Sequence, residues 1–165
     1  MIRFFRKIYS ASGALIILIL SIAPILVAYF LEYVLHMPPC RLCVYQRIPY
    51  WFLLFISLIS LLLSFREIEV NYKKVYALSL FVYFIGSSVS FFHLGVENGW
   101  FYYESVCTFS DAKFSTFAEY RAFIESADLV LCDTRSPLFL GATAAAYNFL
   151  YNLFCIFVVY FKFRK

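Results

Sequence analysis

The sequence predicts an all-α integral membrane protein, a single domain of residues 1–165 built as a bundle of four transmembrane helices. Hydrophobic residues make up 64% of the chain, well above the roughly 45–50% of a soluble domain. A chain this short cannot bury so much apolar surface in a core of its own. The charges stand at the ends of the apolar runs and form no basic stripe, so the net charge of +4 does not indicate a nucleic-acid partner.

The first two predicted spans cover residues 11–35 and 48–65, each about long enough to cross a bilayer. The first contains one charge, Glu32, near its end. Positive residues precede it, as in a signal peptide, but its apolar run is too long and lacks a clear cleavage site, so we interpret it as a retained anchor. Pro24 is expected to kink this helix. Pro49 is expected in the first turn of the second helix, where proline is tolerated.

The third and fourth predicted spans cover residues 75–94 and 138–161. The third carries only His93 near its end, and the fourth carries no charge. Because a backbone in lipid must satisfy its own hydrogen bonds, all four spans are predicted to be helices. Four spans place both termini on the same side of the membrane.

Positive residues predict which side that is. Nine of the fourteen lysines and arginines lie at the two termini and in the 66–74 loop, and the cation-rich face of a membrane protein is cytoplasmic. The loops at 36–47 and 95–137 are therefore predicted to face outward.

The long outer loop contains one pattern typical of a helix. Thr116-Phe117-Ala118-Glu119 fits a capping box. Apolar residues follow it at roughly helical spacing, namely Phe117, Tyr120, Phe123, Ile124 and Ala127. The pattern fits a short amphipathic helix on the membrane surface and an ordinary loop helix equally well.

Four of the five cysteines fall in the two outer loops, and an even set of thiols in an oxidising compartment suggests disulfides. Cys40 and Cys43 form a C-x-x-C pair at the mouth of the second span. A small ring gains little stability from loop closure, which argues against a purely structural role. Cys107 and Cys132 enclose 24 residues, and their bridge could be structural or an exchange partner. Cys155, inside a span, is expected to be a packing residue.

These cysteines leave three interpretations open: structural disulfides, a four-cysteine zinc site, and a thiol–disulfide relay. Zinc sites usually present two short C-x₂₋₄-C knuckles. This chain has one, so no metal is expected. The relay is the favoured interpretation.

Two ionisable residues near the C-x-x-C are candidates for a bound cofactor. Arg47 follows Cys43 by about one helical turn, so its guanidinium could favour a thiolate or polarise a bound carbonyl. The alternative is an arginine that reaches for the lipid headgroups. His93 lies at a similar depth, either as an interfacial hydrogen-bonding residue or as a functional one.

The neighbouring residues resemble a known family. Pro39–Tyr50 reads P-C-R-L-C-V-Y-Q-R-I-P-Y and resembles the P-C-x-L-C-x-x-Q-R-x-P-Y signature of the disulfide bond formation protein B (DsbB) family. His93–Trp100, which leads to Cys107, is similar to the family's H-x-G-V-E-x-G-W…C stretch. Cys132-Asp133, Phe139-Leu140-Gly141 and Asn148 are similar to its C-D…F-L-G…N pattern.

The chain departs from the family pattern at three places. Pro137 stands where an aromatic residue often precedes F-L-G, and Ala142–Tyr147 replaces the usual L-S-M-x-x-W. Glu104 and its neighbours replace a frequent Gly-Pro before the third cysteine. The differences in the fourth span affect the shape of the expected quinone pocket and leave the thiols untouched.

The resemblance implies a protein-dithiol:quinone oxidoreductase. Such an enzyme reoxidises a periplasmic DsbA-like dithiol oxidase and passes the electrons to ubiquinone or menaquinone in the membrane lipid, which sustains protein disulfide formation. It implies that the partner's thiolate attacks a Cys107–Cys132 disulfide at Cys107 and that the freed Cys132 attacks Cys40. Cys43 is then left as a thiolate beside the quinone. Arg47 would stabilise this thiolate, and His93 would be a further contact to the quinone.

Two rival interpretations remain. A vitamin K epoxide reductase-like protein couples similar thiols to quinone, but its loop pair usually comes first in the chain, the reverse of the order here. The other rival is a non-catalytic four-span assembly or adaptor protein with structural disulfides. Redox-inert cysteines would support this interpretation.

Overall fold

The computed structural model describes residues 2–66, 68, 70–103, 116–118, 132, 137–139 and 141–164. Within these ranges the chain forms four long helices, each long and apolar enough to cross a membrane. They are α1 (Ile2–Tyr33), α2 (Arg41–Phe65), α3 (Tyr72–Glu97) and α5 (Ala144–Arg164). The predicted class, an all-α four-span membrane bundle, is confirmed.

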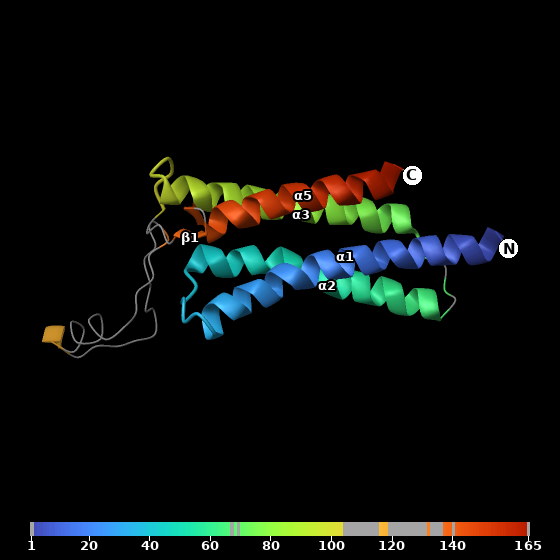
Figure 1. The fold of residues 1–165 in the computed structure, drawn as a ribbon, viewed down its shortest axis with the longest axis horizontal. Coiled ribbons are helices and arrows are strands. Elements are labelled where there is room, and N and C mark those ends of the chain that lie inside the picture. The colour runs from blue at the N-terminus through green and yellow to red at the C-terminus, as the bar shows by residue number, and fades with distance from the viewer. Residues whose placement is uncertain are drawn as a thin grey trace.

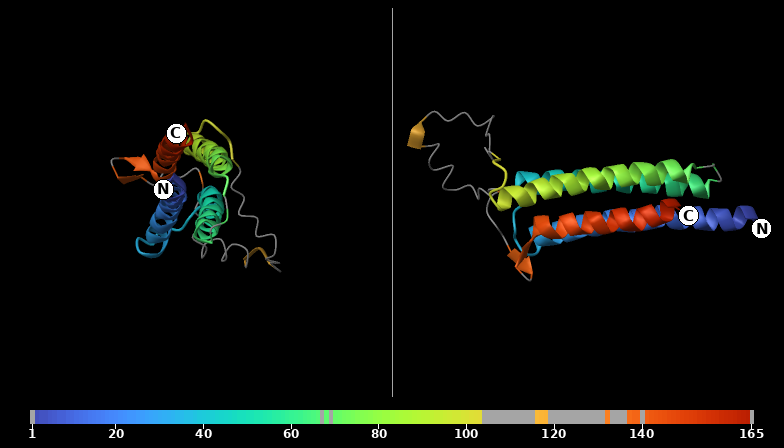
Figure 2. Two further views of the ribbon diagram at one scale, coloured as in Figure 1. Left: turned by 90° about the vertical axis from the view of Figure 1, so that its right-hand side faces the viewer. Right: turned by 90° about the horizontal axis from the view of Figure 1, so that it is seen from above.

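The helices pack in two pairs, with α1 along α2 and α3 along α5 (Figure 1). Both chain termini lie at one end of the bundle, as four spans predict. The connection from α1 to α2 and the start of α5 lie at the opposite end (Figures 1 and 2). This second end, which we call the mouth of the bundle, carries Cys40 and Cys43.

The second helix begins earlier than the apolar run predicted. It starts at Arg41, seven residues before Ile48, and Cys40 is its N-cap, with a sulfur that accepts a hydrogen bond from the backbone N–H of Cys43. The placement of Pro49 in the first turn was therefore wrong, because Pro49 lies about two turns inside α2. The cap, which hydropathy cannot show, sets this helix start. The connection between the first two helices shortens accordingly to 34–40.

The fourth helix begins later than predicted, at Ala144 rather than near Leu138. The preceding residues form a small antiparallel pair, β1 (Pro137–Phe139) with β2 (Ala142–Thr143). Gly141 turns the chain between them with a φ of 75°, a left-handed conformation that favours glycine. The Thr143 hydroxyl then accepts a hydrogen bond from the backbone N–H of Ala146 at 3.4 Å and caps the helix. These strands lie beside the mouth of the bundle (Figure 2).

A buried cluster from all four helices holds the bundle together, and its members are Ile17, Ile25, Tyr50, Leu53, Tyr76, Val82, Tyr83, Cys155 and Val159. Close helix contacts depend on small residues. A Cβ on Gly86, for example, would lie 2.8 Å from Oδ1 of Asn152. Cys155 is fully buried in this cluster, consistent with the expected packing role.

Part of the outer loop lies outside the described residues. Thr116, Phe117 and Ala118 are described, and Phe117 and Ala118 are helical and exposed. Glu119 and the residues that were predicted to continue this helix lie outside the description, and so does Cys107. The surface helix therefore stays a prediction.

Candidate redox site

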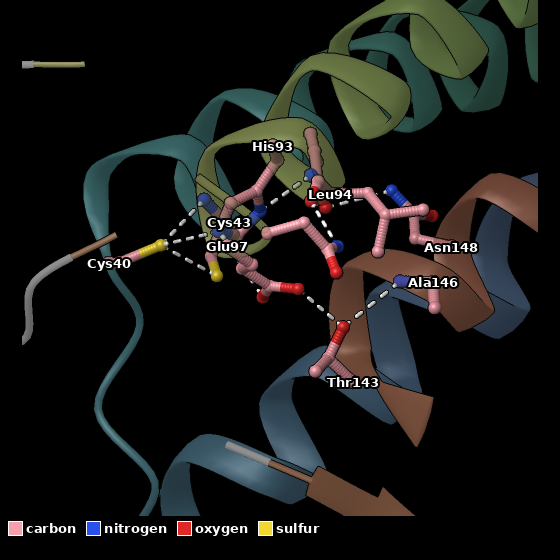
Figure 3. A network of polar contacts seen from close by, with 10 residues as sticks. Cys40, Cys43, His93, Leu94, Glu97, Thr143, Ala146 and Asn148 are labelled. Carbon is pink, nitrogen blue, oxygen red and sulfur yellow. Dashed lines mark hydrogen bonds and ion pairs between the residues drawn. The ribbon is translucent and has the colours of Figure 1, made fainter. Parts of the chain in front are cut away.

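The C-x-x-C pair is built by the start of α2. Cys40 is the N-cap, in extended conformation, and Cys43 lies in the first turn. Residues three apart at a helix start share one face, so the two sulfurs meet at 2.9 Å, with the Cys40 thiol donating to Cys43 (Figure 3). The backbone N–H of Cys43 donates in turn to the Cys40 sulfur at 3.3 Å. Two thiols at this spacing can interconvert between dithiol and disulfide with little backbone movement.

The tertiary structure brings a third cysteine to this pair. Cys132 is 1% exposed and packs in a small cluster with Cys40, Leu42 and Val96. Its sulfur also lies against the first backbone N–H groups of α2, which suits a sulfur that becomes negatively charged. Three of the four predicted catalytic cysteines therefore gather at the mouth, and the fourth, Cys107, lies outside the described residues.

The environment keeps two of these thiols protonated. The hydrogen bond that Cys40 donates to Cys43, together with burial, raises the pKa of Cys40 to about 12, while the contact with His93 opposes this shift. Burial raises the pKa of Cys132 to about 11. Because Cys43 accepts the hydrogen bond within the pair, it is the sulfur best placed to carry negative charge.

His93 lies one turn before the end of α3 and faces the cysteines. Its Nε2 is 3.6 Å from the Cys40 sulfur and 3.6 Å from Oε1 of Glu97. Thr143 donates to the other oxygen of this carboxylate at 2.6 Å (Figure 3). The ligand atoms of Cys40, Cys43 and His93 all lie within 4.8 Å of one another, a grouping with the composition of a soft-metal site.

Arg47 has partners that the sequence did not predict. Its Nη1 lies 2.7 Å from Oε2 of Glu32 in α1, and its guanidinium lies over the ring of Tyr29 at 5.2 Å. The ion pair and the ring hold Arg47 between α1 and α2, so it does not extend freely to the headgroups. A signal was present in the sequence, since a carboxylate within an apolar span requires a partner.

A polar network joins α2, α3 and α5 behind His93, and sequence reasoning missed it. Gln46 contacts Nδ1 of His93 at 2.9 Å, and Asn148 contacts Gln46 at 3.0 Å and Ser90 at 2.8 Å. The Tyr50 hydroxyl donates to the carbonyl oxygen of Asn148 at 2.5 Å. The signal that could have found it is the presence of amide side chains inside apolar runs, because such groups must be paired in lipid.

A cavity of about 860 Å³ opens beside these residues, between α1, the start of α2 and the start of α5. Its wall is mainly apolar, and polar groups gather at one part of it. The polar part includes Cys40, Cys43, Arg47, His93 and Glu97. Concave, mostly apolar pockets of this size with a few convergent polar groups are typical of cofactor and small-molecule sites.

The fold and this site define a four-span helical membrane protein with a dithiol centre at one end. The family model of the disulfide bond formation protein DsbB matches residues 10–161, and the chain belongs to this family. It is thus a membrane disulfide-bond formation protein, an oxidoreductase in the general sense. A protein of Rickettsia prowazekii (strain Madrid E), described as uncharacterized, is 30% identical over 148 residues, which cover 87% of this chain and 81% of that protein. No solved structure gives a significant match.

Proposed function

We propose that this protein is a membrane thiol oxidase that takes electrons from a periplasmic DsbA-like dithiol protein and passes them through two cysteine pairs to membrane quinone. One observation carries the proposal: Cys132 packs on Cys40, and Cys40 and Cys43 line an apolar cavity in a membrane bundle. A third cysteine, the C-x-x-C pair and a mainly apolar cavity are thus adjacent.

The cavity fits a quinone in its chemistry. The mainly apolar wall suits a lipid-soluble ring, the guanidinium of Arg47 suits a carbonyl oxygen, and the imidazole of His93 lines the same cavity. When bound, a quinone supplies the terminal two-electron acceptor, because a disulfide within the chain only passes the electrons on. Arg47, His93 and Cys43 are the residues that would hold it, and the nearby Glu32 carboxylate keeps Arg47 oriented.

The cysteines perform the transfer in two exchanges. A thiolate of the partner attacks Cys107 of a Cys107–Cys132 disulfide, a bond forms at Cys107, and the electron pair of the broken bond leaves on Cys132. Cys132 then attacks Cys40, the Cys40–Cys132 bond forms, and the electron pair of the Cys40–Cys43 bond leaves on Cys43. The packing of Cys132 against Cys40 supports the second exchange, and the hydrogen-bonding pattern of the pair supports Cys43 as the leaving sulfur.

The proposed location is the bacterial inner membrane, with both termini in the cytoplasm and the mouth of the bundle toward the periplasm. The distribution of lysine and arginine supports this orientation. It places the cysteines where a soluble periplasmic dithiol can reach them.

The test uses the full-length protein in detergent with a reduced DsbA-like protein and ubiquinone-1, with quinone absorbance as the readout. We expect partner-dependent quinone loss that Cys43→Ala abolishes. The matched control is Cys155→Ala, which removes a buried thiol of the bundle interior and should retain the wild-type rate. Full turnover by Cys43→Ala would overturn the proposal. Cysteines that the partner cannot reduce would favour the non-catalytic assembly or adaptor protein.

A further inference from the structure

The polar network behind His93 runs through Ser90, Asn148 and Gln46. The hydrogen bonds of Ser90 decide which group donates and which accepts at each contact. The Ser90 hydroxyl donates its one hydrogen to the carbonyl oxygen of Gly86 at 2.8 Å. Toward Asn148, 2.8 Å away, the Ser90 oxygen can therefore only accept. The atom of Asn148 that faces Ser90 must be the Nδ2 amide nitrogen, because two acceptor oxygens at that distance would repel each other.

The same reasoning assigns donor and acceptor at the two remaining contacts, first between Asn148 and Gln46 and then between Gln46 and the imidazole of His93. The same Nδ2 of Asn148 lies 3.0 Å from Gln46, so the atom of Gln46 at that contact is the carbonyl oxygen. Its amide Nε2 then faces Nδ1 of His93 at 2.9 Å and donates to it. A ring nitrogen that accepts a hydrogen bond carries no hydrogen, so a neutral His93 holds its proton on Nε2.

The cysteine end of the network fits the same assignment. Cys40 donates its S–H to Cys43. Toward Nε2 of His93, at 3.6 Å, the Cys40 sulfur is therefore the acceptor and Nε2 the donor. His93 is 2% exposed and Ser90 is fully buried, so these groups find their hydrogen-bond partners mainly within the protein. The cysteine end is thus compatible with the direction that Ser90 sets.

We propose that Ser90, Asn148 and Gln46 are positioning residues that fix His93 as the Nε2–H tautomer, so that its imidazole presents a hydrogen-bond donor to the sulfur of Cys40 and to Oε1 of Glu97, each 3.6 Å from Nε2. His93 is then a donor that stabilises a Cys40 thiolate, and it is not a base that removes the Cys40 proton. The role in turnover rests on the proposed function, while the tautomer itself does not.

The Nε2–H group of His93 contributes in the step in which the Cys40 sulfur is displaced from a disulfide as a thiolate. In the proposed relay, the partner's second thiol displaces Cys107 from the mixed disulfide, and the Cys107 thiolate attacks the Cys132 sulfur of the Cys40–Cys132 bond and forms a new S–S bond with it. The Cys40–Cys132 bond breaks, and its electron pair leaves on Cys40. A hydrogen bond from Nε2–H to that sulfur lowers the energy of the leaving thiolate. No proton needs to move in this step.

The tautomer also decides how the Cys40, Cys43 and His93 grouping behaves toward metals. A zinc or copper ion binds the lone pair of a ring nitrogen. On His93 the nitrogen that faces the cysteines carries the hydrogen, and the lone pair on Nδ1 is occupied by Gln46. The network therefore disfavours a metal at a place whose ligand types would otherwise suit one.

The test is nitrogen NMR of the full-length protein in detergent, labelled with ¹⁵N-histidine, above about pH 8, where an ordinary imidazole is neutral. The chain has two histidines, and His36→Gln assigns the signals of His93. Protonated and unprotonated ring nitrogens resonate far apart. We expect a protonated Nε2 and an unprotonated Nδ1 for His93, and the reverse assignment would overturn the proposal.

A pair of serine variants tests the relay itself. Tyr50→Phe, which removes the other group that orients Asn148, is combined with each serine variant. Ser90→Ala in that background removes the remaining acceptor, and we expect a signal of protonated Nδ1 to appear for His93. Ser88→Ala is the matched control, because Ser88 makes the same kind of bond, to the carbonyl of Phe84 at 2.9 Å, on an exposed part of α3. An unchanged tautomer in Ser90→Ala with Tyr50→Phe would overturn the relay. Neither result depends on quinone turnover, so a failed oxidase assay leaves this test intact.

Discussion

Cysteines occupy two contrasting regions of this bundle. At the mouth, the Cys40 sulfur contacts Cys43, His93 and the Cys132 side chain, and it borders a cavity. In the bundle interior, Cys155 is fully buried in a cluster of aliphatic and tyrosine side chains. Cys40 and Cys155 are both buried, so burial alone does not distinguish a reactive sulfur from a packing one.

The difference lies in what surrounds each sulfur. The mouth supplies hydrogen-bond donors, a second sulfur within 2.9 Å and a route for a small molecule. The interior supplies close packing for Cys155. Thiol chemistry needs a thiolate, an attacking or leaving partner, and access, and these coincide at the mouth.

Removal of Cys132 should produce the largest effect, because it separates the two pairs. In Cys132→Ala we expect quinone reduction driven by the protein partner to fall by about 100-fold or more, since the relay from the outer pair is broken. Reduction driven by dithiothreitol, which can reach Cys40–Cys43 directly, should persist near the wild-type rate. An assay of quinone absorbance with each reductant measures both. Partner-driven turnover at the wild-type rate would remove Cys132 from the path.

The raised pKa of Cys132 should also be measurable as slow alkylation. Burial raises this pKa from 9.0 to about 11, so the thiol stays protonated at neutral pH and its thiolate fraction there is about 100-fold lower than for an unshifted thiol. In the fully reduced protein, iodoacetamide labelling of Cys132 should keep rising with pH up to about 11, whereas a reference thiol levels off near 9. Mass spectrometry of the Cys132 peptide follows it. A plateau at the reference pH would contradict the burial of this thiol.

Loss of the Glu32 carboxylate should have a smaller effect. Glu32→Gln removes the charge that orients Arg47 at 2.7 Å, and we expect the KM for ubiquinone-1 to rise by about tenfold, the scale of one charge-assisted hydrogen bond. Arg47→Met should raise this KM at least as much. It should leave thiol exchange between the partner and the Cys107–Cys132 pair intact. Steady-state kinetics at varied quinone concentration measure the KM. Unchanged values in both variants would place Arg47 outside the quinone site.

The fold was predictable because lipid imposes simple rules. Four apolar runs predict four helices, and four helices place both termini at one end, as the structure has them. The helix boundaries were less predictable. The Cys40 cap moved the start of α2 toward the N-terminus, and the β1–β2 turn at Gly141 moved the start of α5 toward the C-terminus. Caps and turns depend on local hydrogen bonds, which hydropathy does not report.

The sequence by itself determined the membrane class and the number of spans, since hydropathy lies within single segments. It also singled out Cys40, Cys43, Arg47 and His93 as candidates, and these four residues line one cavity in the structure. Only the tertiary structure decided that Cys132 lies on Cys40, that Glu32 pairs with Arg47, and that Asn148 orients Gln46. Each of these contacts joins residues far apart in the chain. Their partners depend on how the helices pack side by side, which a one-dimensional pattern does not encode.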